Sequence, residues 1–128
     1  MKVPANFKHT ICLDFDGVCN TYNGWKGEDF LFEPRPGLFE FILVLQENNR
    51  RIAIFSVRPA KKLEDWFITN FKDPAKALIS TGDLFFPDKK PPADVYIDDR
   101  AITFRGSFVD IIEETLNFRA FWEKQNAS

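Results

Sequence analysis

The sequence predicts an α/β protein with a central parallel sheet of about five strands, folded as one domain over residues 1–128. Short apolar segments alternate with longer segments whose apolar residues recur at helical spacing. Several short segments are apolar throughout, which is typical of parallel strands covered on both faces. The chain is also long enough to bury a core without metal or disulfide staples. Strand–helix–strand repetition in such a chain favours right-handed crossovers, with helices on the faces of the sheet.

The first expected elements are a strand, a loop and a helix. Residues 9–15 form a short apolar run that Gly17 ends, which predicts a strand. Residues 17–35 have mixed polarity, several glycines and no helical period, so we expect a long loop or flap there. A helix is expected within 34–49, where Pro36 suits the first turn. Its apolar residues recur at helical spacing: Leu38, Phe41, Ile42 and Leu45.

The middle of the chain is expected to add one further helix and several strands. Residues 50–56 (RRIAIFS) form the second predicted strand, and a helix should begin at Pro59. One apolar stripe follows that helix, made of Leu63, Trp66, Phe67 and Phe71. The remaining predicted strands are 76–80 (KALIS), 94–99 (DVYIDD) and 101–106 (AITFRG).

The end of the chain is expected to be one helix over 107–124. Ser107 is a suitable N-cap for it. The residues predicted to face the core are Phe108, Ile111, Ile112, Leu116 and either Phe121 or Trp122.

Composition excludes some classes of function. The formal net charge is −2, with acids and bases spread along the chain, which argues against nucleic-acid or membrane binding through bulk charge. The spacing of Cys12 and Cys19 matches no zinc or redox motif, so buried thiols in a reducing cytoplasm are expected. The N-terminus lacks the apolar segment of a signal peptide, and no stretch is long enough to span a membrane.

Polar residues stand where predicted strands end, and in open parallel sheets ligands bind beyond those ends. These residues are Asp14 and Asp16, then Ser56, then Asp98 and Asp99. Four carboxylates on one rim cannot all stay ionised without a cation, and a site made of oxygen ligands favours magnesium. Magnesium in turn binds phosphate oxygens, which a serine hydroxyl and a lysine can also contact. Lys89 and Lys90 are both available in PDKKPPADVYIDD.

Taken in order, these motifs resemble those of the haloacid dehalogenase superfamily of phosphohydrolases. DFDGV is followed by a serine that ends the next strand, then by a lysine and by DD at the end of a later strand, all within residues 11–100. Residues 90–106 resemble small capless members from bacterial and phage genomes, which are described as hydrolases. The resemblance implies a Rossmann-like domain with no cap, because 17–35 leaves room for a flap only. It also implies a magnesium-dependent phosphomonoesterase that forms an aspartyl-phosphate.

The resemblance assigns the first motif to chemistry. Asp14 would be the nucleophile that takes the phosphoryl group. Asp16 would protonate the leaving oxygen, then deprotonate the water that hydrolyses the intermediate, and its backbone carbonyl would contact the metal. Gly17 would let the chain turn sharply and approach the phosphate.

The later motifs are assigned to phosphate and metal binding. Ser56, with Val57 and Arg58 after it, belongs to the implied phosphate-binding set. Lys90 is the preferred motif lysine by alignment of the lysine–proline stretch, with Lys89 as the alternative. The resemblance makes Asp98 a direct magnesium ligand. It makes Asp99 either a second ligand or a residue that orients the metal's waters. Asp14 and Asp16 complete the implied metal set.

Each assignment has a structural alternative. Asp16–Gly17 and Asp98–Asp99 could each be only a turn. Ser56 could cap the helix after Pro59. Arg58 could pair with a surface acid instead of contacting substrate. The aromatics of the flap (Tyr22, Trp25, Phe30 and Phe32) could stack on a base or sugar, although packing onto the core is the favoured interpretation.

Rival functions follow from the same parts. Dehalogenases of the superfamily resemble this chain but lack the second acid of motif one and the metal. A phospho-receiver domain has similar parts, but its accepting aspartate ends a middle strand, and no aspartate ends KALIS. A catalytically idle phosphate-binding protein is the third rival.

A capless rim goes with large substrates, or with a partner subunit of the same chain that closes the site. Nucleotides, nucleic-acid ends, sugar phosphates and phosphoproteins are all compatible substrates.

Overall fold

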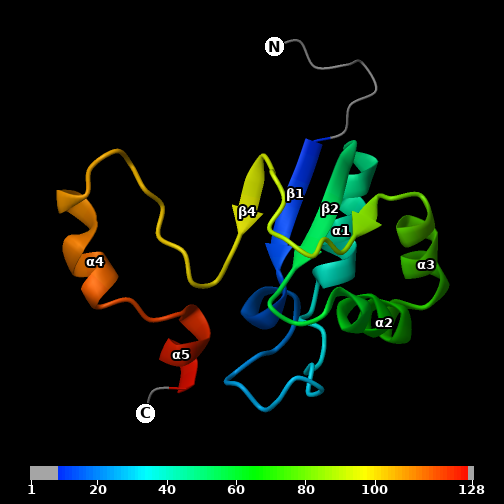
Figure 1. Cartoon of the computed structure of the whole chain (residues 1–128), viewed down its shortest axis with the longest axis horizontal. Coiled ribbons are helices and arrows are strands. Elements are labelled where there is room, and N and C mark those ends of the chain that lie inside the picture. The colour runs from blue at the N-terminus through cyan, green and yellow to red at the C-terminus, as the bar shows by residue number, and fades with distance from the viewer. Residues whose placement is uncertain (1–8, 127–128) are drawn as a thin grey trace, which may run out of the picture.

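Four parallel strands form the sheet of the computed structural model, which describes residues 9–126 (Figure 1). The strands are β1 (His9–Asp14), β2 (Arg50–Phe55), β3 (Leu84–Phe85) and β4 (Val95–Ile97), in the order β3-β2-β1-β4. Helices flank the sheet, so the architecture is α/β and consistent with a Rossmann-like fold. Within this described part, no helix has the length and apolar character that crossing a bilayer requires.

The core lies between the two central strands and the helices that cover them. Helix α1 (Leu38–Glu47) packs against β2, and α2 (Ala60–Phe71) packs against α3 (Asp73–Ser80), which in turn contacts β3. Leu13, Ile54 and Phe67 are among the buried side chains of this cluster. The apolar stripes predicted for 34–49 and for the helix after Pro59 cover the sheet in part: Ile42 and Leu63 are fully buried, whereas Phe41, predicted on the first stripe, is 42% exposed.

Residues 76–80 were predicted as a strand and are helical instead. They form the second half of α3, which begins at Asp73 with Pro74 in its first turn. Ala75 and Leu78 are buried at a spacing of three residues, which is a helical period that a five-residue window conceals. The strand of this region is the two-residue β3, placed after Gly82 and Asp83.

The predicted fifth strand at 101–106 is also wrong. β4 is paired on one side with β1, and after Asp99 the chain leaves the sheet without further strand structure up to Gly106. Figure 1 shows this segment running away from β4 toward the C-terminal helices.

The predicted helix at 107–124 is broken into three pieces: a 3₁₀ turn (Val109–Ile111), α4 (Ile112–Leu116) and α5 (Phe121–Asn126). Asn117 ends α4, because its backbone and side-chain N–H groups both donate to the Glu113 carbonyl. The expected inward face is mostly exposed, with Phe108 at 78% and Leu116 at 79%. Only Trp122, on α5, is buried.

Strand register places the polar residues of the site. Asp14 pairs with Phe55 across β1 and β2, and Leu13 pairs with Ile97 across β1 and β4. The three strands therefore end at the same level, and Ser56, Asp98 and Asp99 follow immediately beyond the ends of β2 and β4. Asp14 itself ends β1, which lies between these two strands.

Candidate active site

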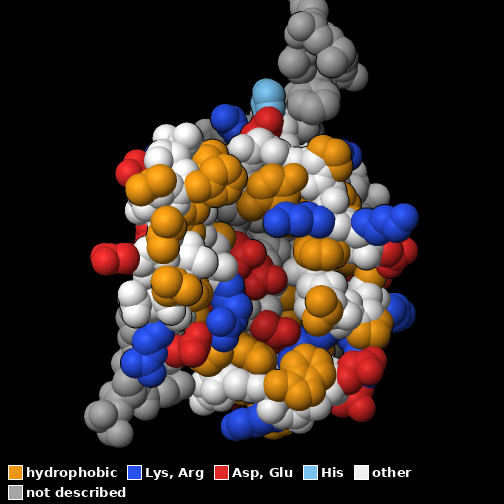
Figure 2. Space-filling model, turned by 60° about the vertical axis from the view of Figure 1, so that its left-hand side comes forward, with side chains coloured by type: hydrophobic (Ala, Val, Ile, Leu, Met, Phe, Trp, Pro, Cys, Tyr) orange, Lys and Arg blue, Asp and Glu red, His pale blue; other side chains and the backbone are white. Residues whose placement is uncertain are grey.

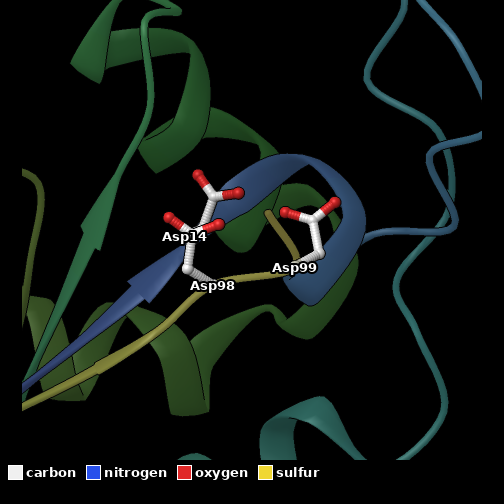
Figure 3. Close-up of side chains that lie close together, drawn as sticks. All are labelled: Asp14, Asp98 and Asp99. Carbon is white, nitrogen blue, oxygen red and sulfur yellow. The ribbon is translucent and has the colours of Figure 1, made fainter. Parts of the chain in front are cut away.

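Three carboxylates converge at the carboxyl end of the sheet. Asp14, Asp98 and Asp99 each offer an oxygen, and these oxygens all lie within 4.8 Å of one another. In Figure 3, Asp14 projects from the end of β1, and the other two project from the chain just after β4 toward it. Figure 2 shows acidic side chains gathered in a hollow of the surface, with basic and apolar side chains around it. The predicted rim is therefore present for three of its four acids.

Asp14 is partly buried and lies next to three other carboxylates. Burial raises the pKa of this half-buried carboxyl to about 8, and a hydrogen bond with Asp99 and the negative charges of Asp98, Asp99 and Asp16 add to the effect. A bound proton relieves the repulsion, and a cation shared by the three groups would do the same. An all-oxygen set of acids suits magnesium, so the residues present fit the ion that the sequence predicts.

Asp16 is the fourth acid, and its side chain lies outside this cluster. One of its oxygens accepts a hydrogen bond from Asn20 Nδ2 at 2.9 Å, and the other accepts one from Arg58 Nε at 2.9 Å. Both oxygens of Asp16 thus accept hydrogen bonds from side chains outside the cluster. Asp16 is held in place by partners other than the metal candidates.

Arg58 is neither a surface residue nor open to solvent, although it was predicted to contact substrate or a surface acid. It is 3% exposed, and besides Asp16 it donates through Nη1 to the backbone carbonyls of Gly27 (3.1 Å) and Glu28 (2.7 Å). Its guanidinium therefore joins Asp16 to the flap. Its Nη2 is buried and makes no hydrogen bond within residues 9–126.

Asn20 was not identified from the sequence, and it organises the turn after β1. The side chain is fully buried; its Oδ1 accepts from the N–H of Gly17 at 2.9 Å, and its Nδ2 also donates to the carbonyl of Leu31 at 2.9 Å. A single asparagine in a polar loop cannot be recognised from the sequence, because the fold alone brings its partners Gly17 and Leu31 together.

Gly17 lies directly against the acidic cluster. Its φ is +90°, a conformation that favours glycine, and an added Cβ would come within 2.0 Å of Asp99 Oδ2 and 3.0 Å of Trp122 Nε1. The turn interpretation of Asp16–Gly17 is thus correct as local structure, and the glycine also permits the close approach of Asp99.

We expect Gly17→Ala to lower the free energy of unfolding by more than the strain of its positive φ alone accounts for. Gly106 provides a matched control, since its φ is +100° and an added Cβ would meet nothing within 4 Å. Gly106→Ala should cost about 1 kcal/mol, and Gly17→Ala about 1–2 kcal/mol more, because Asp99 must move. Urea unfolding of the two variants measures the difference, and equal losses would show that the predicted clash is absorbed without cost.

Trp122 is a second residue that sequence reasoning missed at the site. Its Nε1 donates to Asp99 Oδ2 at 2.5 Å, and its ring packs edge-on against Tyr22 of the flap at 5.2 Å. Arg100 lies over the same ring at 5.0 Å and pairs with Glu123 at 2.9 Å. The end of the chain therefore reaches back to hold one of the three acids.

Lys90 lines a cavity that opens beside the cluster. The cavity has a volume of about 80 Å³ and is lined by Cys12, Asp14, Phe55, Lys90, Tyr96, Ile97 and Asp98. Lys90 Nζ stands 4.6 Å from the centre of the Tyr96 ring, and the Tyr96 hydroxyl donates to the Pro91 carbonyl at 2.7 Å. Both lysines are exposed, and Lys89 is not among the residues that line this cavity. Tyr96, not singled out from the sequence, thus braces the segment that carries Lys90.

The remaining predicted residues follow β2 and β4. The hydroxyl of the half-buried Ser56 accepts the N–H of Arg58 at 3.1 Å, and no side chain caps α2, so the helix-cap alternative for Ser56 is wrong. Val57 is 92% exposed at the rim. Asp98 Oδ1 accepts the N–H of Arg100 at 2.7 Å, so Asp98–Asp99 is a turn as well as part of the cluster.

The flap aromatics divide into two pairs by exposure. Tyr22 and Phe32 are half-buried and contact each other at 5.4 Å. Trp25 and Phe30 are exposed, at 57% and 49%, although the Phe30 ring lies edge-on against Phe32 at 4.7 Å. Tyr22, Phe30 and Phe32 therefore pack against one another within the flap, and the Trp25 ring contacts the Arg58 guanidinium instead.

No protein-family model and no curated protein matches the sequence. Among solved structures, the chain is similar to a conserved protein from Bacteroides thetaiotaomicron, with 24% identity, a TM-score of 0.49, and coverage of 84% of this chain and 92% of that one. A similarity of this degree assigns no family and no activity.

Proposed function

We propose that the protein is a magnesium-dependent phosphomonoester hydrolase of the haloacid dehalogenase type, with no cap domain, acting through an aspartyl-phosphate at Asp14. The observation that carries the proposal is the convergence of Asp14, Asp98 and Asp99 within 4.8 Å at the carboxyl end of the sheet. Lys90, in the cavity that Asp14 also lines, supports it. Asp14, Asp98 and Asp99 would hold magnesium, which when bound would neutralise charge on them and on the phosphate.

The first step would transfer the phosphoryl group to Asp14. A carboxylate oxygen of Asp14 attacks phosphorus, the bond from phosphorus to the alcohol oxygen breaks, and Asp16 supplies the proton that the alcohol takes. Lys90 and the Ser56 hydroxyl stabilise the charge on the phosphoryl oxygens, while Gly17 leaves space for Asp99 beside Asp14.

The second step would regenerate the enzyme. Water attacks the phosphorus of the aspartyl-phosphate and loses its proton to Asp16, and the bond between phosphorus and Asp14 breaks. The acceptor hydrogen bonds from Asn20 and Arg58 to Asp16 suit this role as a base. Inorganic phosphate is then released, and Asp16 is again protonated for the next cycle.

A phospho-receiver function is disfavoured by the corrected strand assignment. A receiver needs its accepting aspartate at the end of a middle strand. The segment KALIS, predicted to be that strand, is helical. The strand that does follow β2 is β3, and the residue after it is Phe86. The strand after β2 therefore does not end on the aspartate that a receiver needs.

The direct test is a screen of phosphomonoesters, including p-nitrophenyl phosphate, with magnesium and with a chelator. We expect phosphate release from some of these compounds only when magnesium is present. If magnesium-loaded protein hydrolyses none of them, an idle phosphate-binding protein replaces the proposal.

Magnesium should also raise the melting temperature, because it binds the folded acids and relieves their repulsion. At a hundredfold excess over Kd, mass action contributes about 2.7 kcal/mol, which corresponds to a rise of roughly 10 °C for a chain of this size. Asp98→Ala should abolish the rise. Asp110→Ala, which removes an exposed acid after β4 instead, should retain it. An equal rise in both variants would place magnesium elsewhere.

A further inference from the structure

We propose that Trp25 binds the leaving alcohol of the substrate and that this alcohol is a nucleoside, whose base stacks on the exposed face of the indole ring. The substrate class is then a phosphate ester of a nucleoside, either free or at the end of a strand. This inference rests on the proposed phosphatase function.

Trp25 is fixed on the side of the site where the leaving group departs. The Arg58 guanidinium lies over its ring, 4.6 Å from the centroid, and the same guanidinium donates through Nε to Asp16 at 2.9 Å. A single guanidinium group therefore separates the indole from the carboxylate that serves the leaving oxygen. Because Arg58 is buried and tied to the flap carbonyls of Gly27 and Glu28, this separation is held by the fold.

The indole does not serve the packing of the flap. Tyr22, Phe30 and Phe32 supply that packing: Phe32 contacts both other rings, and Tyr22 also contacts Trp122. Trp25 is 57% exposed, and its ring contact among residues 9–126 is with the cation of Arg58. The ring thus has one face occupied by a charge and a large surface open to solvent, which is the form of a stacking platform.

The spacing distinguishes a nucleoside from other alcohols. Glycerol and the serine side chain have no ring to place on an indole, and a sugar bonded to the ester oxygen would lie in the gap before the indole. In phosphotyrosine and p-nitrophenyl phosphate the ring is bonded directly to the ester oxygen, so it would lie at Asp16 and not beyond the guanidinium. In a nucleotide the ribose spans that gap and places the base next to Trp25.

Binding can be tested without turnover in an Asp14→Asn background with magnesium. Trp66 and Trp122 are buried, at 7% and 9% exposure, so fluorescence quenching by a stacked base reports mainly on Trp25. Adenosine 5′-monophosphate should quench the emission and bind roughly 5- to 100-fold more tightly than ribose 5-phosphate. Trp25→Ala should remove that difference. Phe108→Ala, which removes an exposed aromatic after β4, should leave it intact.

Turnover gives the second test. Trp25→Ala should lower kcat/KM for adenosine 5′-monophosphate roughly 5- to 100-fold, mainly through KM, and should change ribose 5-phosphate little. Trp25→Phe should restore most of the loss. A 5′-phosphorylated oligonucleotide in the same assay separates the two sources of the nucleoside, because the preferred one will show the larger loss in Trp25→Ala.

Equal losses on the nucleotide and on ribose 5-phosphate would overturn the inference, since Trp25 would then act on Asp16 through Arg58. No preference of the wild-type protein for the nucleotide would overturn it as well. Failure of the proposed function looks different, because the wild-type protein with magnesium would then hydrolyse neither compound.

Discussion

Asp14→Asn is expected to abolish phosphate release while the protein remains folded. The amide keeps the shape of the carboxyl group but has no nucleophilic oxygen, and loss of a nucleophile costs on the order of 10⁴-fold or more in kcat. Release of phosphate from p-nitrophenyl phosphate and from a nucleotide measures the effect. Mass spectrometry of acid-quenched protein should find one added phosphoryl group on the wild type and none on the variant.

The stability of this variant is a separate readout. In the folded protein without magnesium, the pKa of Asp14 is raised to about 8 from an ordinary value of 3.8. The folded state therefore binds a proton that the unfolded state lacks between these values, and stability falls as pH rises through this range. Asparagine removes the penalty, so the magnesium-free variant should be at least as stable as the wild type at pH 7. A folded variant with near-native rates would contradict the covalent mechanism.

Asp16→Asn should slow phosphoryl transfer from alkyl phosphates far more than from p-nitrophenyl phosphate. An alkoxide needs a proton as it leaves, whereas p-nitrophenolate does not, and general acid help is typically worth about 10²–10⁴ in rate. The second step should slow for both substrates, because Asp16 would act there as the base. Single-turnover kinetics separate the two steps.

The variant also leaves the buried Arg58 without its carboxylate partner, which destabilises the fold. The comparison is made between two substrates on the same folded variant, so a loss of stability affects both equally. An amide oxygen at position 16 can still accept from Arg58 Nε, which preserves the geometry. Equal losses in the first step on both substrates would assign Asp16 a structural role and send the search for the proton donor to the flap.

Periodicity and strand-end logic predicted the parts of the fold that regular structure governs. β1, β2 and β4 and the helices after Pro36 and Pro59 were expected, because their apolar patterns extend over several residues. Strand-end logic also predicted that Asp14, Asp98 and Asp99 lie at one edge of the sheet, as they do, because parallel strands in register end together.

Other features depend on irregular backbone, which leaves no periodic signal. KALIS is too short to distinguish a strand from the end of a helix, and the break at Asn117 depends on one side chain bonding back to the helix. The pairing of Asp16 with Arg58 joins residues 42 positions apart through a flap that has no repeat. Either Phe121 or Trp122 was expected to face the core, whereas the contact of Trp122 with Asp99 follows from a path of the chain after β4 that no pattern indicated.

The hydrogen bond from Trp122 to Asp99 makes the docking of α5 and the occupancy of the acidic cluster two sides of one equilibrium. Trp122 donates to Oδ2 of Asp99 and so restrains a carboxylate that belongs to the cluster. The coupling is reciprocal: if a cation at Asp99 stabilises the docking of α5, the docked helix stabilises the binding of the cation by the same free energy. Opening of the C-terminal segment, as measured by hydrogen exchange, would then depend on the concentration of the ion, although most of that segment lies far from the sheet.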